Sequence, residues 1–144
     1  MKMLLIGYFV CLTGAVQAQK LNLSKVPGAA KAAFAKANPN KAGEWEKENG
    51  NYEVNFKKDE KKMSYVINKN GSILETEGEI DVNELPETVK DYVKQHNKGV
   101  IAKGAEKIVK ANGETSYEVK VKGNELMFDS NGKMIKQERK EYKK

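Results

Sequence analysis

The chain has 144 residues and a formal net charge of +6, and its many charged residues are interspersed rather than grouped in blocks. It contains one cysteine and one histidine, which excludes an internal disulfide framework and a zinc site built from several cysteine or histidine ligands. No basic stretch is interleaved with aromatic residues in the manner of single-strand-binding proteins, so we expect no nucleic-acid partner.

The first 18 residues have the organisation of a secretory signal peptide. Lys2 precedes a mostly apolar run over residues 3–16, and Val16-Gln17-Ala18 has the small-x-small pattern of a cleavage site. We predict cleavage after Ala18 and export to the periplasm or outside the cell. The run is too short to span a bilayer, so no transmembrane segment is expected after cleavage. Cys11 would leave with this segment. A buried N-terminal helix is the alternative interpretation.

Two segments of the remaining chain, residues 19–80 and 81–144, repeat one pattern. Each has an apolar residue and a proline, Val26-Pro27 and Leu85-Pro86, followed by apolar residues at helical spacing. We predict one amphipathic helix in each copy, with the proline in its first turn. The predicted buried faces are Val26, Ala30, Ala33, Phe34 and Ala37 in the first copy and Leu85, Val89, Tyr92, Val93 and His96 in the second.

After each helix the hydrophobic period changes from 3.6 residues to two. Tyr52-Glu53-Val54 recurs letter for letter as Tyr117-Glu118-Val119, within segments that alternate apolar and polar residues. Asn-Gly pairs at 49–50, 70–71, 112–113 and 131–132 mark tight turns. We predict strands over residues 44–48, 51–57, 62–68, 72–78, 105–110, 115–122, 125–129 and 133–140.

The predicted fold class is α+β, with two tandem units. Each unit is one helix packed on a four-stranded antiparallel meander sheet. A unit of about 60 residues is marginally stable alone, so we expect the two copies to stabilise each other. The sequence leaves open whether the eight strands form one continuous sheet or two.

Several motifs follow one another in a fixed order. The first copy has Val26-Pro27, Glu44-Trp45-Glu46-Lys47-Glu48-Asn49-Gly50, Tyr52-Glu53-Val54 and Asn70-Gly71-Ser72-Ile73-Leu74-Glu75-Thr76-Glu77. The second copy has Leu85-Pro86, Ala105-Glu106-Lys107-Ile108, Tyr117-Glu118-Val119 and Phe128-Asp129-Ser130-Asn131-Gly132-Lys133. In this order they resemble the PepSY-like, or beta-lactamase-inhibitor-like, proteins of Bacteroidota envelopes. The resemblance extends from about Val26 to Arg139.

This resemblance implies a small periplasmic or secreted protein built from tandem helix-plus-sheet units, in a family mostly without assigned function. Related PepSY domains occur in the propeptides of thermolysin-type proteases, where an inhibitory or regulatory role is inferred. The beta-lactamase inhibitor protein covers an enzyme with a sheet surface built from two repeats. The present chain lacks the cysteines of that inhibitor, and no inhibitory residue can be transferred to it.

No set of residues predicts an active site. His96 has no suitably spaced histidine, cysteine or carboxylate partner, so we interpret it as a boundary residue at the end of its helix. The serines show no nucleophile-elbow pattern. Glu75, Glu77, Glu79 and Asp81 would point to one side of a strand, but they lack the spacing of a calcium loop. We therefore expect no enzyme activity, no cofactor and no metal.

The candidate partner-facing residues lie on the strands that follow the helices. Trp45 is the only tryptophan, a residue type often found as a binding anchor. Counting back from the Asn-Gly turns gives Ile108 as its counterpart, which favours a place in the core instead. The full candidate set is Trp45, Glu53, Asn55, Lys57, Glu118, Lys120 and Lys122.

The functional prediction is an exported, non-catalytic binding module, monomeric or weakly dimeric. It would engage a protein or peptide through the face or an edge of its sheet. One alternative is an inhibitor or regulator of a periplasmic or secreted hydrolase of the protease or beta-lactamase type. Another is a structural envelope protein without a specific ligand.

Overall fold

The computed structural model describes residues 19–96 and 104–139. The predicted signal peptide, its cleavage site after Ala18 and Cys11 lie outside the described residues. Export and cleavage therefore stay predictions. The same holds for the boundaries predicted for the two repeats at residues 19–80 and 81–144.

Two helices of ten residues, α1 (Gly28–Ala37) and α2 (Glu87–His96), each follow a proline and a short 3-10 turn, η1 (Leu23–Lys25) or η2 (Val82–Glu84). Pro27 is the N-cap of α1, one position before the first turn in which we predicted it. The strands are β1 (Gln19–Lys20), β2 (Glu44–Glu48), β3 (Asn51–Lys58), β4 (Lys61–Ile67), β5 (Ile73–Ile80), β6 (Gly104–Lys110), β7 (Thr115–Val121), β8 (Asn124–Asp129) and β9 (Met134–Arg139).

The strands form one antiparallel sheet in chain order, from β1 to β9. The question that the sequence left open is thus answered: the four-stranded meanders of the two units are parts of one continuous sheet, and the bounds of the predicted strands are close to the observed ones. The two repeats join where β5 pairs with β6, from Glu75↔Lys110 to Ile80↔Ala105. This pairing gives hydrogen-bond partners to backbone groups that two separate sheets would each leave free at an edge. The two-residue strand β1 was not predicted.

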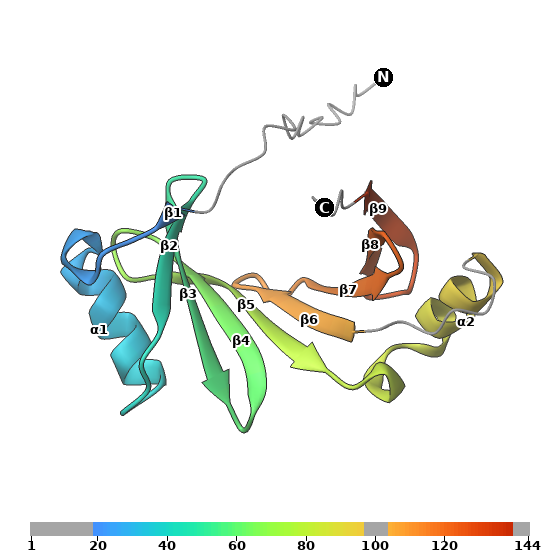
Figure 1. Cartoon of the computed structure of the whole chain (residues 1–144), viewed down its shortest axis with the longest axis horizontal. Coiled ribbons are helices and arrows are strands. Elements are labelled where there is room, and N and C mark those ends of the chain that lie inside the picture. The colour runs from blue at the N-terminus through green and yellow to red at the C-terminus, as the bar shows by residue number, and fades with distance from the viewer. Residues whose placement is uncertain (1–18, 97–103, 140–144) are drawn as a thin grey trace, which may run out of the picture.

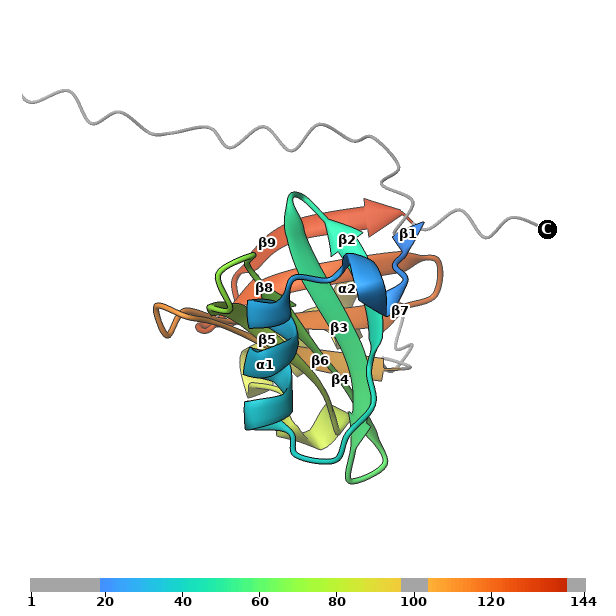
Figure 2. The same ribbon diagram turned by 90° about the vertical axis from the view of Figure 1, so that its left-hand side faces the viewer.

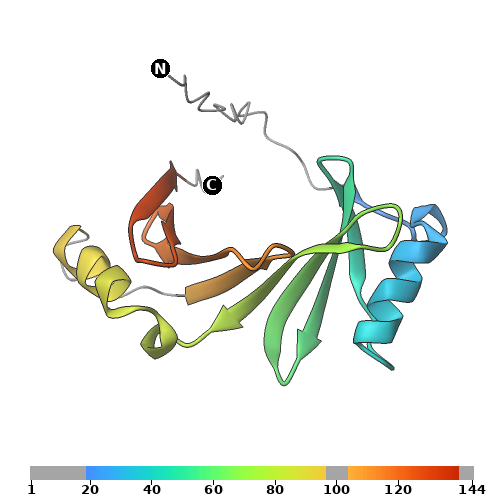
Figure 3. The ribbon, with the colours of Figure 1, turned by 180° about the vertical axis from the view of Figure 1, so that it is seen from behind.

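Both helices lie on the same side of this sheet. Figure 1 shows the sheet bent into an arch, with α1 and α2 on its outer, convex side at opposite ends. In Figure 2 α1 lies in front of the strands, and Figure 3 shows the same arch from behind. The inner, concave side carries no helix of the described residues. We call this side the helix-free face.

Each helix covers its own hydrophobic core. Below α1, Phe34 makes edge-to-face contacts with Trp45, Phe56 and Tyr65. Below α2, Val89 and Val93 pack in a second cluster, whose other buried members are Leu85, Ala105, Val119, Val121, Leu126 and Phe128. The predicted helix faces are confirmed except at their last positions, because Ala37 and His96 are exposed.

Candidate functional site

The pairing register assigns side chains to the helix-free face. Paired residues on neighbouring antiparallel strands point to the same side of a sheet. Val54 and Val119 point into the two cores, so their neighbours along the strands point to the opposite side. Rows across the sheet then place together Asn55, Ser64, Glu77, Ile108 and Ser116, and likewise Glu79, Glu106, Glu118, Met127 and Lys136.

Four of the predicted partner-facing residues are half-buried on this face: Glu53, Asn55, Glu118 and Lys120. The structure brings the last two together, because Lys120 Nζ lies 2.7 Å from Glu106 Oε1 and 3.7 Å from Glu118 Oε1. Lys57 at the end of β3 and Lys122 just after β7 are exposed. These two lysines lie at the margin of the helix-free face.

Trp45 does not belong to this surface. It is 4% exposed, and it packs against Phe34 on the helix-covered side. Its structural counterpart is Ala105 rather than Ile108, because Trp45 pairs with Val54 and Ala105 pairs with Val119. The loop between β6 and β7 is longer than the Asn49-Gly50 turn between β2 and β3, so counting back from the Asn-Gly pairs misaligns the two copies.

Ile108 lies on the helix-free face with only 6% of its surface exposed. It stands between Glu77 on one neighbouring strand and Ser116 on the other. Ser64, in the same row, is also buried, and its hydroxyl donates a hydrogen bond of 3.3 Å to Glu77 Oε2. The buried residues Ser64, Ile108 and Ser116 therefore form the middle of the helix-free face, between carboxylates, and we call them its floor.

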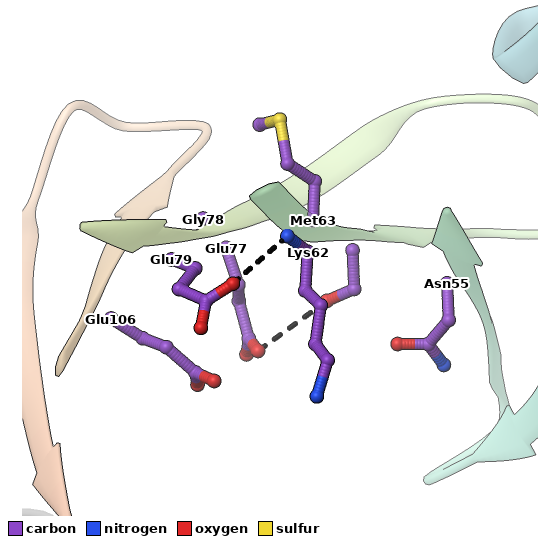
Figure 4. Close-up of a pocket in the computed structure, with 8 residues that line it drawn as sticks. Asn55, Lys62, Met63, Glu77, Gly78, Glu79 and Glu106 are labelled. Atoms are coloured by element: carbon purple, nitrogen blue, oxygen red, sulfur yellow. Dashed lines mark hydrogen bonds between the residues drawn. The ribbon is translucent and has the colours of Figure 1, made fainter. Parts of the chain in front are cut away.

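A hollow of about 100 Å³ opens on this floor at the junction of the two repeats. Its lining residues are Asn55, Lys62, Met63, Ser64, Glu77, Gly78, Glu79 and Glu106. Figure 4 shows the side chains of Glu77, Glu79 and Glu106 gathered on one side, whereas Met63 points the opposite way. The backbone N–H of Lys62 donates a hydrogen bond of 3.1 Å to Glu79 Oε2. β4 and β5 of the first repeat and β6 of the second all contribute to the hollow.

Carboxylates dominate the helix-free face although the whole chain is positively charged. On the strands of the first repeat, the face carries Glu44, Glu46, Glu48, Glu53, Glu75, Glu77 and Glu79. On those of the second repeat, it carries Glu106, Glu118, Glu125 and Glu138. The lysines between them are Lys20, Lys57, Lys62, Lys110, Lys120 and Lys136.

The crowding of these carboxylates changes their proton affinity. Burial, followed by a hydrogen bond and repulsion from Glu75, raises the pKa of Glu77 to about 8. Burial also raises the pKa of Glu53, and repulsion from Glu48 adds to it. Burial disfavours the charged form of Lys120, but its bonds to Glu106 raise its pKa overall. Glu77 thus holds a proton at neutral pH that an ordinary glutamate would have released.

The site residues that sequence reasoning missed are Glu77, Glu106 and Ser64. Glu77 was noted within a row of outward glutamates, but the sequence did not show that it would be half-buried. Glu106 meets this row only through the pairing of β5 with β6. In the described ranges, no three histidine, cysteine, aspartate or glutamate residues are arranged to hold a metal ion together.

His96 lies away from the hollow, on α2 at the other side of the sheet. It stacks on Tyr92 at a centroid distance of 4.0 Å, and its Nδ1 lies 2.9 Å from the Tyr92 carbonyl oxygen. Its exposed position at the last residue of α2 agrees with the predicted boundary role.

A family model matches the chain over residues 15–75 and again over residues 50–136, and its description is "Putative beta-lactamase-inhibitor-like, PepSY-like". The chain belongs to the PepSY-like family. The resemblance found in the motifs is thereby confirmed, and the two matches agree with two repeated units. No curated protein matches the chain.

Solved structures of Bacteroides proteins share the fold. A DUF2874 family protein from Bacteroides ovatus superposes with a TM-score of 0.66 at 17% identity, covering 78% of this chain and 86% of that one. A BLIP-like protein from Bacteroides fragilis gives 0.56 at 21% identity, with the same coverage. A structure from Bacteroides eggerthii, described among "putative periplasmic proteins", gives 0.67 at 12% identity, covering 79% and 88%. Within the described part of this PepSY-like chain, neither helix has the length and apolar character to cross a membrane.

Proposed function

We propose that this PepSY-like protein is an exported, non-catalytic binding module that engages a protein or peptide through its helix-free face. The observation that supports the proposal is the one-sided cover of the sheet. Both helices pack on the convex side, so the concave side is available to a partner over the width of β2 to β8. A bent sheet presents a broad surface, and its half-buried polar side chains suit a wet, reversible interface.

The sheet edges are the competing surface. β1 covers the edge of β2 with only two residues, and β9 forms the opposite edge. Ile135 on β9 is 57% exposed. An extended partner segment could add to β9 as a further strand. However, the register shift between Met127 and Phe128 bulges β9 at this residue, and bulges at edges oppose strand addition. The helix-free face is therefore the favoured surface.

Site-specific photo-cross-linking separates these surfaces. A photoreactive amino acid is placed at Lys62 on the helix-free face, at Ile135 on the edge, or at Lys94 on α2, and the protein is irradiated with envelope extract of the producing organism. We expect a discrete protein adduct from position 62 and none from position 94. An adduct from position 135 alone would transfer the function to the edge. Equal adducts from all three positions, or none, would contradict specific binding.

A second candidate, an inhibitor of a periplasmic or secreted hydrolase, is favoured by the description of the family and by the BLIP-like fold. The same adducts test it. If the partner cross-linked at position 62 is a protease or beta-lactamase, the purified protein should lower its activity in proportion to complex formation. Full activity of the complexed hydrolase would exclude this candidate and leave the binding module.

A further inference from the structure

Like charges stand directly opposite each other on the helix-free face. The register pairs Glu46 with Glu53, Glu79 with Glu106, and Glu106 with Glu118. Like charges in directly opposed positions of an antiparallel sheet destabilise it. The fold thus carries an electrostatic cost that is concentrated on the surface without helices.

The compensation for this cost is uneven between the repeats. On the strands of the second repeat, Lys120 forms ion pairs with Glu106 and Glu118. Among the ion pairs of the described residues, none involves Glu53, Glu77 or Glu79, and Lys62 of the hollow lies beyond ion-pair distance from them. In the first repeat, Glu44 pairs with Lys20 at 3.0 Å and Glu77 holds a proton at neutral pH, whereas Glu53 and Glu79 have no ion-pair partner among the described residues.

The floor beside these carboxylates offers two further kinds of contact. Ile108 supplies an apolar surface on the same face, next to Glu77. Ser116 is 8% exposed, stands next to Ile108 in the row, and its hydroxyl makes no hydrogen bond within the residues that the structure describes. This hydroxyl is not one of the fully buried polar atoms of the described residues, so it reaches the surface and has capacity for a ligand's donor group.

Together these features match one kind of side chain. Lysine and arginine combine an apolar stem, which can lie along Ile108, with a cationic head that carries several hydrogen-bond donors. The carboxylates do not converge as metal ligands in the described ranges. An organic cation is therefore a better match than a bare metal ion.

We propose that the helix-free face binds a lysine- or arginine-rich segment of its protein partner, laid across the strands from β3 to β6 with its cationic heads on Glu53 and Glu79. This inference rests on the proposed function, because it names the chemistry of the partner that the same face engages. On the first repeat, the bound cations compensate the carboxylates as Lys120 does on the second repeat.

Octalysine peptide is the probe, and its affinity is measured by isothermal titration calorimetry at low salt. The test variant is E53Q/E79Q, which breaks no ion pair found among the described residues. The control variant E60Q/D91N removes the same charge from exposed positions, in the turn before β4 and on α2, and it likewise breaks no ion pair found among the described residues. We expect the test variant to weaken binding at least about tenfold and the control by no more than about twofold, since screened pairs lose little. Circular dichroism verifies that both are folded.

Equal weakening by both variants would overturn the inference, because octalysine would then sense only net charge. Unchanged affinity of the test variant would overturn it as well. A titration with calcium chloride and no peptide provides a further test. If calcium binds the wild type and the test variant abolishes this binding, the face is a metal site and the inference is overturned. In a competition arm, octalysine should suppress the adduct formed at position 62. An adduct that persists in excess octalysine refutes the cationic partner while the proposed function stands, whereas the absence of any adduct at position 62 when no octalysine is added refutes the function.

Discussion

At the scale of single residues, Glu77 shows how position rather than residue type sets chemistry. Glu75, Glu77 and Glu79 alternate along β5 and look equivalent in the sequence. In the sheet, Glu77 lies between Ser64 and Ile108, both of which are buried. The loss of water around its carboxylate and the charges beside it raise its pKa to about 8. No period or spacing in the sequence carries this information.

The pH dependence of stability follows from this shift. The pKa of Glu77 is raised from 4.5 in an unperturbed glutamate to about 8 in the folded state. Folding therefore favours its protonated form, and its contribution to stability, fully present below the unfolded pKa, is lost as the pH rises through the folded one. We expect the urea midpoint of the wild type to fall between about pH 6 and about pH 9, and the fall to be smaller in E77Q.

The control for this measurement is E87Q, a carboxylate removed from the exposed first turn of α2. It should retain the pH slope of the wild type. If E77Q and E87Q show the same slope, Glu77 does not hold its proton in the folded state at neutral pH, and the account of the crowded carboxylates on the helix-free face is wrong.

At the scale of elements, the hairpins were predictable because their signals are local. Asn49 and Gly50 both have positive φ angles, 47° and 81°, as a tight turn of this type requires. The bounds of the strands follow from such turns and from the period of two. The sequence did not show which residues of β2 correspond to those of β6. The loop that follows β6 is longer than the turn that follows β2, and this changes the alignment of the two copies without changing the alternation of apolar and polar residues.

The turn before β9 also positions α2. Gly132 has φ 80°, and a Cβ built on it would lie 2.7 Å from the Cβ of Thr88 in α2. Gly113 has a similar φ of 86°, but nothing lies within 4 Å of its added Cβ. Both G132A and G113A strain the backbone, and only G132A also clashes with α2. We expect G132A to lose more stability than G113A, by over about 1 kcal/mol, in urea unfolding.

Equal losses in the two variants would mean that the helix moves away from the turn at no cost. The contact between Gly132 and Thr88 would then not hold α2 on the sheet, and the hydrogen bond of 3.2 Å from Thr88 Oγ1 to the Asn131 carbonyl would be incidental.

At the scale of the whole molecule, the continuous sheet couples two cores that share no buried residue. The cluster below α1 contains Trp45, and the cluster below α2 contains Phe128. Only the strands between them connect the two, and the pairing of β5 with β6 is as regular as the pairs within each repeat. A strand lost on one side exposes the backbone edge of the other. We therefore expect the molecule to unfold as one unit.

Trp45 is the only tryptophan, so its fluorescence reports on the first core alone. F128A removes a fully buried ring from the second core, at a cost of about 3–5 kcal/mol. If the sheet couples the cores, the midpoints from Trp45 fluorescence and from far-UV circular dichroism should fall together. A fluorescence midpoint that stays at its wild-type value while the dichroism midpoint falls would show two independent units.

The sequence by itself determined the family, the helices, the strands and the hairpins of this protein, because the period of the hydrophobic residues and the chemistry of the Asn-Gly turns are local properties. It also indicated Glu53, Asn55, Glu118 and Lys120 as outward residues. Only the tertiary structure decided that β5 pairs with β6. That pairing depends on hydrogen bonds between residues about 30 positions apart. Because of it, glutamates of both repeats meet on one helix-free face, and a chain with a positive net charge presents a negative surface.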